Sequence, residues 1–278
     1  MDFRNISLLI QKEVKESLKN RWFVIYTICF SALALTLLFF ASSENEIAGF
    51  SGFGRTAASL INLVLLFIPL ISLVTGAISI SNERENGTLA YLLSHPISKS
   101  EVFLGKFIGL LLSILVSICL GFGLSGIVIA VKGGGGDISK YLTTVLLSAL
   151  LAASLLSIGF FVSVLSKKAA KAIGIAIFLW LIFLIFCDLG IMGTAVAMDL
   201  GIKQVFVLSL INPAEVFKIA AVLNLAPRFE VLGPAGIYAL RTFGHAGTFY
   251  LLFFMMILWT AVPLLCGFLV FSVLRRQE

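Results

Sequence analysis

Long apolar runs separated by short polar stretches make up most of the chain. A helix needs about 20 mainly apolar residues to cross a bilayer, because each residue rises about 1.5 Å through a hydrocarbon core about 30 Å thick. Six segments meet this requirement: 22–41, 57–80, 107–131, 141–165, 173–192 and 248–273. The pattern predicts an all-α polytopic membrane protein with six transmembrane helices, built as a single domain over residues 1–278.

A seventh apolar stretch, 202–225, is interrupted by charged residues and a proline. Lys and Arg accumulate on the cytoplasmic side of short loops, and a six-span arrangement places thirteen of the 20 basic residues on the side that holds both termini. A seventh span would move Arg275 and Arg276 to the opposite side. We therefore expect a protein of the cell (inner) membrane with both termini and loop 81–106 in the cytoplasm. Segment 199–247 then lies outside, and the 202–225 stretch within it is expected to form interfacial or packed helices.

Residues 1–21, before the first span, show a helical alternation of apolar and charged side chains. The apolar positions are Ile6, Leu9, Ile10, Val14 and Leu18. This spacing predicts an amphipathic helix, and Trp22 follows where an interfacial anchor belongs. We expect this helix to lie on the cytoplasmic leaflet, and the alternative is a helix packed on a neighbouring part of the chain.

Composition agrees with a membrane protein and excludes a typical water-soluble one. Hydrophobic residues make up 60% of the 278 residues, charged residues only 12%, and the mean hydropathy is +1.10. A water-soluble domain carries about 25% charged residues. Lipid, and not nucleic acid, is therefore the expected surrounding of this chain.

Residues that could hold a metal are scattered. Cys29, Cys119, Cys187 and Cys266 lie in separate apolar runs and form no Cys-x-x-Cys pair, which is typical of packing residues. Two isolated histidines, His95 and His245, do not make the His-Glu-x-x-His motif of an intramembrane zinc protease. We expect no catalytic residue and no metal site in this chain.

Nucleotide chemistry is not expected in this chain either. The sequence contains no Gly-x-x-x-x-Gly-Lys-Ser/Thr loop, and the tetraglycine at 133–136 is typical of a turn. If ATP drives this protein, a partner ATPase binds the ATP and Mg²⁺, and the chain itself carries no cofactor.

Loop 81–106 is the most informative segment. Its sequence, SNERENGTLAYLLSHPISKSEVFLGK, resembles the loop of ABC exporter permeases in which an acidic pair precedes Gly-Thr-Leu, a leucine pair, a proline and a terminal Gly-Lys. The matching residues are Glu83, Glu85, Gly87, Thr88, Leu89, Leu92, Leu93, Pro96, Gly105 and Lys106. The resemblance implies a cytoplasmic coupling helix that contacts an ABC ATPase.

The residues of this loop support the same interpretation physically. An apolar stripe on a short helix needs cover, so we expect docking in a groove of the ATPase, with an ordinary surface loop as the alternative. Leu89 and Leu93, four residues apart, would supply the apolar anchor. Glu83 and Glu85 would hold its approach by pairing with basic groups of the ATPase or of this chain.

Further matches extend the resemblance along the whole chain. They narrow it to the permeases of the transporter that supports maturation of nitrous oxide reductase, the NosY family. The matching positions are Asn20-Arg21-Trp22, Ser166-Lys167-Lys168, Trp180 with Asp188-Leu189, and Leu210-Ile211-Asn212-Pro213 followed by Glu215, Phe217 and Lys218.

This resemblance implies a homodimer of permeases with two cytoplasmic ATPases and an outer β-helical partner of the NosD kind. Such a system supplies copper or sulfur to the copper sites of the reductase. The sequence shows no His, Cys or Met cluster along a copper path, and the adjacent Met255 and Met256 are expected to be packing residues. The alternative is a related exporter of a drug, peptide or lipid, which would lack the β-helical partner.

Four residues are candidates for an outer gate or partner contact: Asp188, Asn212, Pro213 and Glu215. Asp188 is an ionisable residue in the outer half of the fifth span, where it could serve a gate or simply reach water at the headgroups. Pro213 suits the first turn of a helix. One side of that helix, with Val216, Ile219, Ala220 and Leu223, is expected to cap the dimer or touch an outer partner.

Overall fold

The computed structural model describes residues 3–44, 51–94, 97–131, 138–185, 201–225 and 233–273, and within these ranges the chain is helical with no strand. The helices are α1 (Phe3–Lys19), α2 (Arg21–Glu44), α3 (Ser51–Glu85), α4 (Thr88–Ser94), α5 (Lys99–Val131), α6 (Ile138–Leu165), α7 (Ala169–Ile185), α9 (Ile202–Leu210), α10 (Pro213–Leu225) and α11 (Gly233–Val273). The all-α prediction is confirmed.

Four described helices, α3, α5, α6 and α11, are each long and apolar enough to cross a membrane. Two bent pairs also qualify when each is taken as one span: α1 with α2, bent by 72°, and α9 with α10, bent by 110°. Helix α7 is apolar and is described over 17 residues, Ala169–Ile185. These four to six candidate spans confirm a multi-pass membrane protein.

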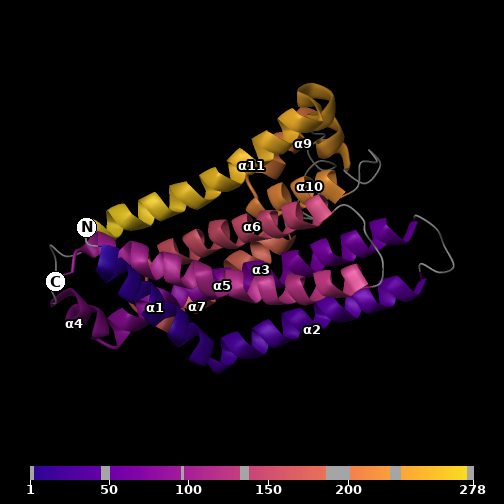
Figure 1. Ribbon diagram of the computed structural model, residues 1–278. Coiled ribbons are helices and arrows are strands. Elements are labelled where there is room, and N and C mark those ends of the chain that lie inside the picture. The colour runs from indigo at the N-terminus through magenta and orange to yellow at the C-terminus, as the bar shows by residue number, and fades with distance from the viewer. Residues whose placement is uncertain are drawn as a thin grey trace.

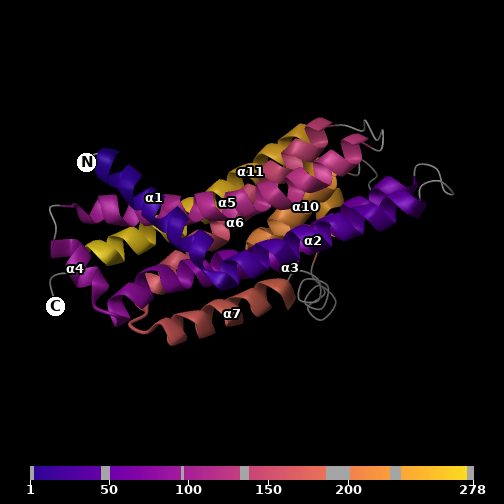
Figure 2. The same ribbon diagram turned by 60° about the horizontal axis from the view of Figure 1, so that its bottom comes forward.

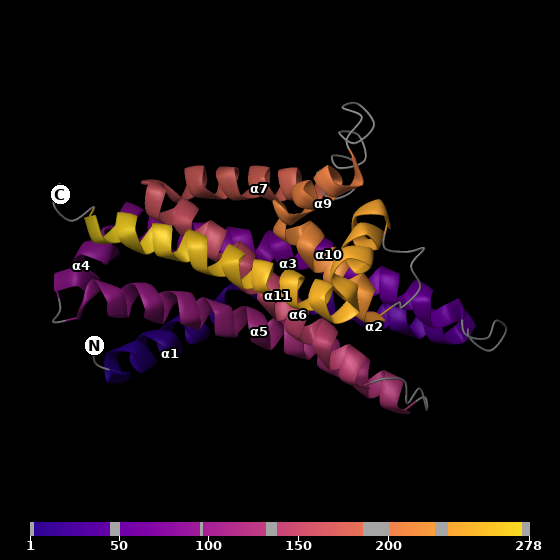
Figure 3. The ribbon, with the colours of Figure 1, turned by 90° about the horizontal axis from the view of Figure 1, so that it is seen from above.

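The long helices run side by side and α6 lies among them (Figure 1). Helix α6 packs on α3, α5, α10 and α11, and α7 lies against α3 on the outside of the bundle (Figures 2 and 3). The start of α1, the short helix α4 and the last turns of α11 lie at one end, which we call the α4 end. Helices α9 and α10 lie at the other, the α10 end (Figure 1).

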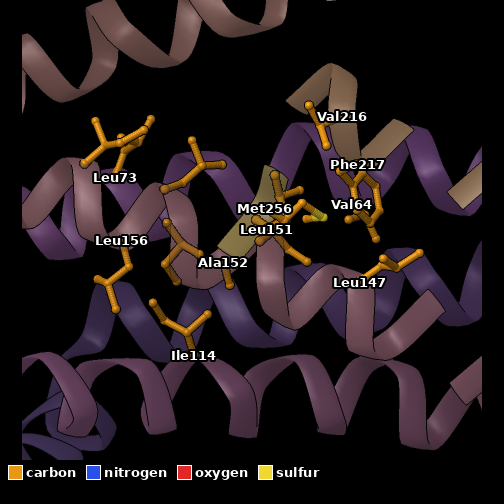
Figure 4. Packing of buried hydrophobic residues seen from close by; sticks show 14 of the residues in the cluster. Val64, Leu73, Ile114, Leu147, Leu151, Ala152, Leu156, Val216, Phe217 and Met256 are labelled. Atoms are coloured by element: carbon orange, nitrogen blue, oxygen red, sulfur yellow. The ribbon is translucent and has the colours of Figure 1, made fainter. Parts of the chain in front are cut away.

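Two glycines bring the backbones of α3 and α6 together at the centre. A Cβ atom added to Gly76 would lie 2.7 Å from the carbonyl oxygen of Leu156, and one added to Gly159 would collide with the carbonyl of Leu73. The apolar core continues along this crossing, with Leu73, Leu151 and Leu156 fully buried (Figure 4). Close approach of small residues is how helices associate within lipid, where the hydrophobic effect is weak.

Helix α10 occupies a different environment from the one predicted. Val216, Ile219, Ala220 and Leu223 are all buried inside the chain, against α3, α6 and α11. Figure 4 shows Val216 near Phe217, Val64 and Met256. The assignment of these four side chains to an outward contact face is therefore wrong. Helical spacing identifies an apolar face, but it does not identify the neighbour that covers it.

Helix α1 forms as predicted. At least one residue of its apolar stripe, Leu9, packs on another helix of the same chain. Leu9 is buried against α5, as in the alternative interpretation of residues 1–21. Its junction with α2 leaves Trp22 exposed, and Asn20 caps α2 by accepting a hydrogen bond from the Trp22 backbone N–H at 3.0 Å. Contact of α1 with the lipid surface stays a prediction.

The last helix begins earlier than the predicted span 248–273. Helix α11 starts at Gly233 and is interrupted at Gly244, whose φ of 69° and ψ of 177° are not helical. A positive φ is accessible to glycine at little cost because it has no Cβ. The segment after Gly244 therefore runs as its own long helix to Val273.

Candidate functional site

The turn between α3 and α4 forms the first part of the candidate site. Gly87 has a φ of 72°, and its N–H bonds to the carbonyl of Arg84 at 3.2 Å, which ends α3 with a left-handed glycine. The Thr88 hydroxyl then donates to the carbonyl of Glu83 at 3.2 Å. The start of α4 is thus fixed to the last turn of α3, and a short helix lies where the sequence predicted one. Pro96 lies outside the described residues.

The side chains of α4 divide differently from the predicted stripe. Leu89 is only 8% exposed and belongs to the core of this chain, while Leu92 and Leu93 are half-buried. Tyr91 is 71% exposed. Leu89 therefore anchors α4 to its own chain and is not available to a partner, which corrects its predicted role as a docking anchor. The surface that α4 offers is centred on Tyr91 and Leu92.

A buried ion cluster lies beside this turn. Lys106 of α5 places its Nζ atom 2.6 Å from Oε1 of Glu13 on α1 and 2.7 Å from Oε1 of Glu83 on α3. The Lys106 side chain is 2% exposed. At the edge of the cluster, Lys12 lies 3.4 Å from the same Glu83 oxygen and 3.6 Å from Glu16. Three helices therefore meet at one ammonium group, and the pairing of Glu83 within this chain agrees with one of the two predicted alternatives.

Two glycines of α5 make room for α1 next to Lys106. A Cβ atom on Gly105 would lie 2.9 Å from the Leu9 Cβ, and one on Gly109 would lie 2.7 Å from the Glu13 Cβ. Side chains at these positions would push α1 away from α5. The glycines flank Lys106 on one helix face, so α1 approaches closely where its carboxylate meets the ammonium group.

Capping interactions tie the end of α3 to the α6–α7 turn. Arg84 donates from Nη1 to the carbonyls of Val164 at 3.1 Å and Ser166 at 3.4 Å, at the carboxyl end of α6. Oε2 of Glu85 accepts from the backbone N–H of Ala169 at 2.7 Å, at the first residue of α7. The two charges match the helix ends that they contact, a cation at a carboxyl end and an anion at an amino end.

At the opposite end, Asn212 and Pro213 begin α10. The side chain of Asn212 accepts from the Ala214 N–H at 2.9 Å, as a helix cap does, and donates to the carbonyl of Phe183 at 2.9 Å. The indole N–H of Trp259 donates to the carbonyl of Leu210 at 3.1 Å. Backbone groups freed by the break between α9 and α10 thus find partners inside the bundle, as a low-dielectric environment requires.

Of the other predicted outer residues, Pro213 is buried at the first position of α10 and Glu215 is half-buried in its first turn. Asp188 lies outside the described residues. The structure therefore brings Asn212 and Pro213 into the bundle and leaves the proposed outer contacts untested.

Metal binding finds no support in the described part of the chain, where no three His, Cys, Asp or Glu side chains are grouped to hold an ion. Met256 is fully buried in the apolar core (Figure 4). What the sequence reasoning missed is the Glu13–Lys106 pair. A signal was present, because Glu13 is placed four residues after Leu9, on the apolar stripe of α1.

Comparison with known proteins assigns the fold to a family. Residues 8–273 match the ABC-2 family transporter protein family. The chain is 27% identical over 276 residues to the probable ABC transporter permease protein NosY of Stutzerimonas stutzeri, which covers 97% of both chains. It is also 27% identical over 245 residues to the protein of the same name from Pseudomonas aeruginosa, covering 84% of this chain and 86% of that one.

Proposed function

Because the chain belongs to the ABC-2 transporter family, we propose that it is a permease driven by a separate cytoplasmic ATPase that docks at the α4 end. The observation that carries this proposal is the position of α4. This short helix presents Tyr91 outward and is fixed to α3 beside a cluster that joins α1, α3 and α5. Movement imposed on α4 would reach three helices at once.

The ATPase supplies the nucleotide chemistry in this proposal, and it binds the ATP and Mg²⁺. Tyr91 and Leu92 provide the apolar contact, since aromatic side chains are favoured at the centres of interfaces. Glu83 and Glu85 hold α4 from within the permease, through the ion cluster and through the amino end of α7. Both chain termini and the α4 end then lie in the cytoplasm, and α9 and α10 lie toward the outer face.

The biological role that we propose is maturation of the copper sites of nitrous oxide reductase. Support comes from the whole-chain similarity to two proteins named NosY. The family resemblance of the segments around Glu83 and Asn212, described in the sequence analysis, points the same way. In this role two permease copies form a homodimer with two ATPases, and an outer β-helical protein receives the transmitted motion. The alternative is a related exporter that carries a drug, peptide or lipid between the two permeases.

Purification of the protein from its native membrane, with identification of the bound chains, tests the assembly. We expect an ABC ATPase and a β-helical outer protein to co-purify. In parallel, the copper content of nitrous oxide reductase is measured in a strain that lacks this permease, and we expect copper-deficient reductase. Recovery of an ATPase alone together with fully metallated reductase would favour the exporter alternative. Recovery of the permease without an ATPase would contradict the proposed function itself.

A further inference from the structure

Lys106 is the last residue of loop 81–106, and yet its side chain is buried. Its ammonium group is withdrawn from solvent and contacts carboxylates on two other helices, Glu13 at 2.6 Å and Glu83 at 2.7 Å. A buried ammonium group is costly unless it is paired, and each of these carboxylates in turn requires a cation. The three side chains therefore form one unit, and removing Lys106 would leave two carboxylates close together with only Lys12 at the edge of the cluster to offset them.

The two carboxylates have different mechanical positions. Glu83 lies in the last turn of α3, and its carbonyl accepts the hydrogen bond of Thr88, the first residue of α4. Its Oε1 contacts both Lys106 and Lys12, whereas its Oε2 is buried without a hydrogen-bond partner among the described residues. Glu83 is thus held through one oxygen, and its link to Lys106 is sensitive to a shift of the α3–α4 turn.

Glu13 is held more completely. Helix α1 fits against α5 at Gly105 and Gly109, and the Glu13 Cβ lies where a side chain on Gly109 would be. Asn5 adds a hydrogen bond from its Nδ2 atom to Glu101 of α5, at 3.4 Å. Steric fit and charge therefore both fix α1 to α5, while charge alone connects Lys106 to Glu83.

We propose that Lys106 is a positioning residue that passes movement of α4 to a rigid unit of α1 and α5, through its contact with Glu83. Helix α1 is then a working part of the energy-coupling machinery and more than a surface anchor. This inference rests on the proposed function, in which α4 receives the movement of the ATPase. It adds a direction of transmission: from α4 to Glu83, from Glu83 to Lys106, and from Lys106 to α5 with α1.

Charge variants separate the two contacts of Lys106. Glu83→Gln removes the ion pairs of Glu83 with Lys106 and with Lys12, and it leaves the Glu13–Lys106 pair in place. The double variant Glu13→Lys with Lys106→Glu restores opposite charges between α1 and α5, but it places the new glutamate against Glu83. Gly109→Leu pushes α1 away with every charge intact. Lys15→Met removes an exposed charge of α1 outside the cluster and is the matched control.

Each variant is co-expressed with the ATPase of its own transporter, and the complex is purified in detergent. Docking of α1 is read by maleimide labelling of Leu9→Cys, introduced after replacement of the four native cysteines, because Leu9 is buried only while α1 lies on α5. Coupling is read as the stimulation of ATP turnover by the permease, relative to the ATPase alone. The labelling shows whether α1 has left α5, and the turnover shows whether the permease still stimulates the ATPase.

We expect Glu83→Gln and the double variant to keep Leu9→Cys protected, and yet to lower the stimulation about five- to tenfold, within the usual range of coupling between sites. Gly109→Leu exposes Leu9→Cys and lowers the stimulation similarly, and Lys15→Met changes neither readout. If both Glu83→Gln and the double variant bind the ATPase and stimulate it as the wild type does, the proposed role of Lys106 is wrong, while the proposed function of the permease still stands. Absence of ATPase binding by the wild-type permease would overturn the proposed function as well.

Discussion

The two ends of the helix bundle are held together by different chemistry. At the α4 end, charged side chains connect helices. They form the cluster around Lys106, and Arg84 and Glu85 of α3 contact the α6–α7 turn. At the α10 end, the described contacts include buried apolar side chains such as Phe217 and neutral hydrogen bonds from Asn212. Hydrogen-bonded ion pairs fix the relative orientation of the groups that they join. Apolar packing also holds a helix in place, but it is not directional.

This difference fits the surroundings expected for each end. Charged contacts are tolerable where water is near, and they are expensive in hydrocarbon. A break between two helices at membrane depth needs internal partners for its freed backbone groups, and the Asn212 and Trp259 side chains supply them. We therefore expect the α4 end to transmit force and the α10 end to keep a preformed structure.

The largest expected effect is an all-or-none difference in labelling between the two sides of the membrane. With the native cysteines replaced, Ser94→Cys on α4 should react only with a reagent that reaches the cytoplasm, and Lys203→Cys on α9 only with an impermeant reagent added outside. Both side chains are exposed, so access is not limited by burial. Labelling of Ser94→Cys from outside would end the proposed topology and the contrast between the two ends.

Next in size is the loss of apolar packing at the α10 end. Phe217 is fully buried, and Phe217→Ala should lower the free energy of unfolding in mixed micelles by about 3–5 kcal/mol because of lost burial and the cavity left behind. The control is Phe254→Ala on α11, where the ring is 60% exposed and a change within about 0.5 kcal/mol is expected. Equal losses for the two variants would show that α10 is not part of the core.

Two helix-capping asparagines provide a smaller and more specific comparison. Asn212→Ala removes a buried cap and leaves the Phe183 carbonyl without its donor, so a loss of about 2 kcal/mol in unfolding free energy is expected. Asn20→Ala removes the exposed cap of α2 and should cost about 0.5–1 kcal/mol. Unfolding of both variants in the same micelles measures the difference. A larger loss for Asn20→Ala would contradict the buried position of the α9–α10 break.

The smallest effect is expected for a single exposed charge at the α4 end. Glu85→Gln weakens the contact with the amino end of α7 and should lower the unfolding free energy by about 0.3–1 kcal/mol at low salt. At about 1 M salt the loss should shrink, since the Debye length falls to about 3 Å. A loss that does not depend on salt would show that Glu85 acts through packing or shape and not through its charge.

Much of the fold was predictable because span length and hydropathy are set by the bilayer. Five of the six apolar runs, the helix in residues 1–21 and the short helix within loop 81–106 correspond to described helices, and the remaining run, 173–192, is described as α7 up to Ile185. The α9–α10 break was signalled by Asn212 and Pro213, which cap and begin a helix. Its depth within the bundle was not predictable, since apolar periodicity gives no information about which neighbour covers a face.

The candidate site was only partly predictable for a related reason. Glu83 and Gly87 were identified from the loop motif, and the structure gives each a local role in the α3–α4 turn. Leu89 was expected on the surface because a seven-residue helix has too few turns to show which leucine faces its own chain. Glu13 and Lys106 are 93 residues apart, and only the tertiary fold brings them together.

Association of the ATPase with the exposed face of α4 tests the central claim most directly. The double variant Tyr91→Asp with Leu92→Asp leaves buried Leu89 and the ion cluster untouched, so α4 should remain folded on α3. Co-purification in detergent should show loss of the ATPase and of its stimulated turnover, whereas the same substitution at exposed Val207 of α9 should change neither. Wild-type ATPase stoichiometry and turnover in the α4 variant would contradict docking at the α4 end.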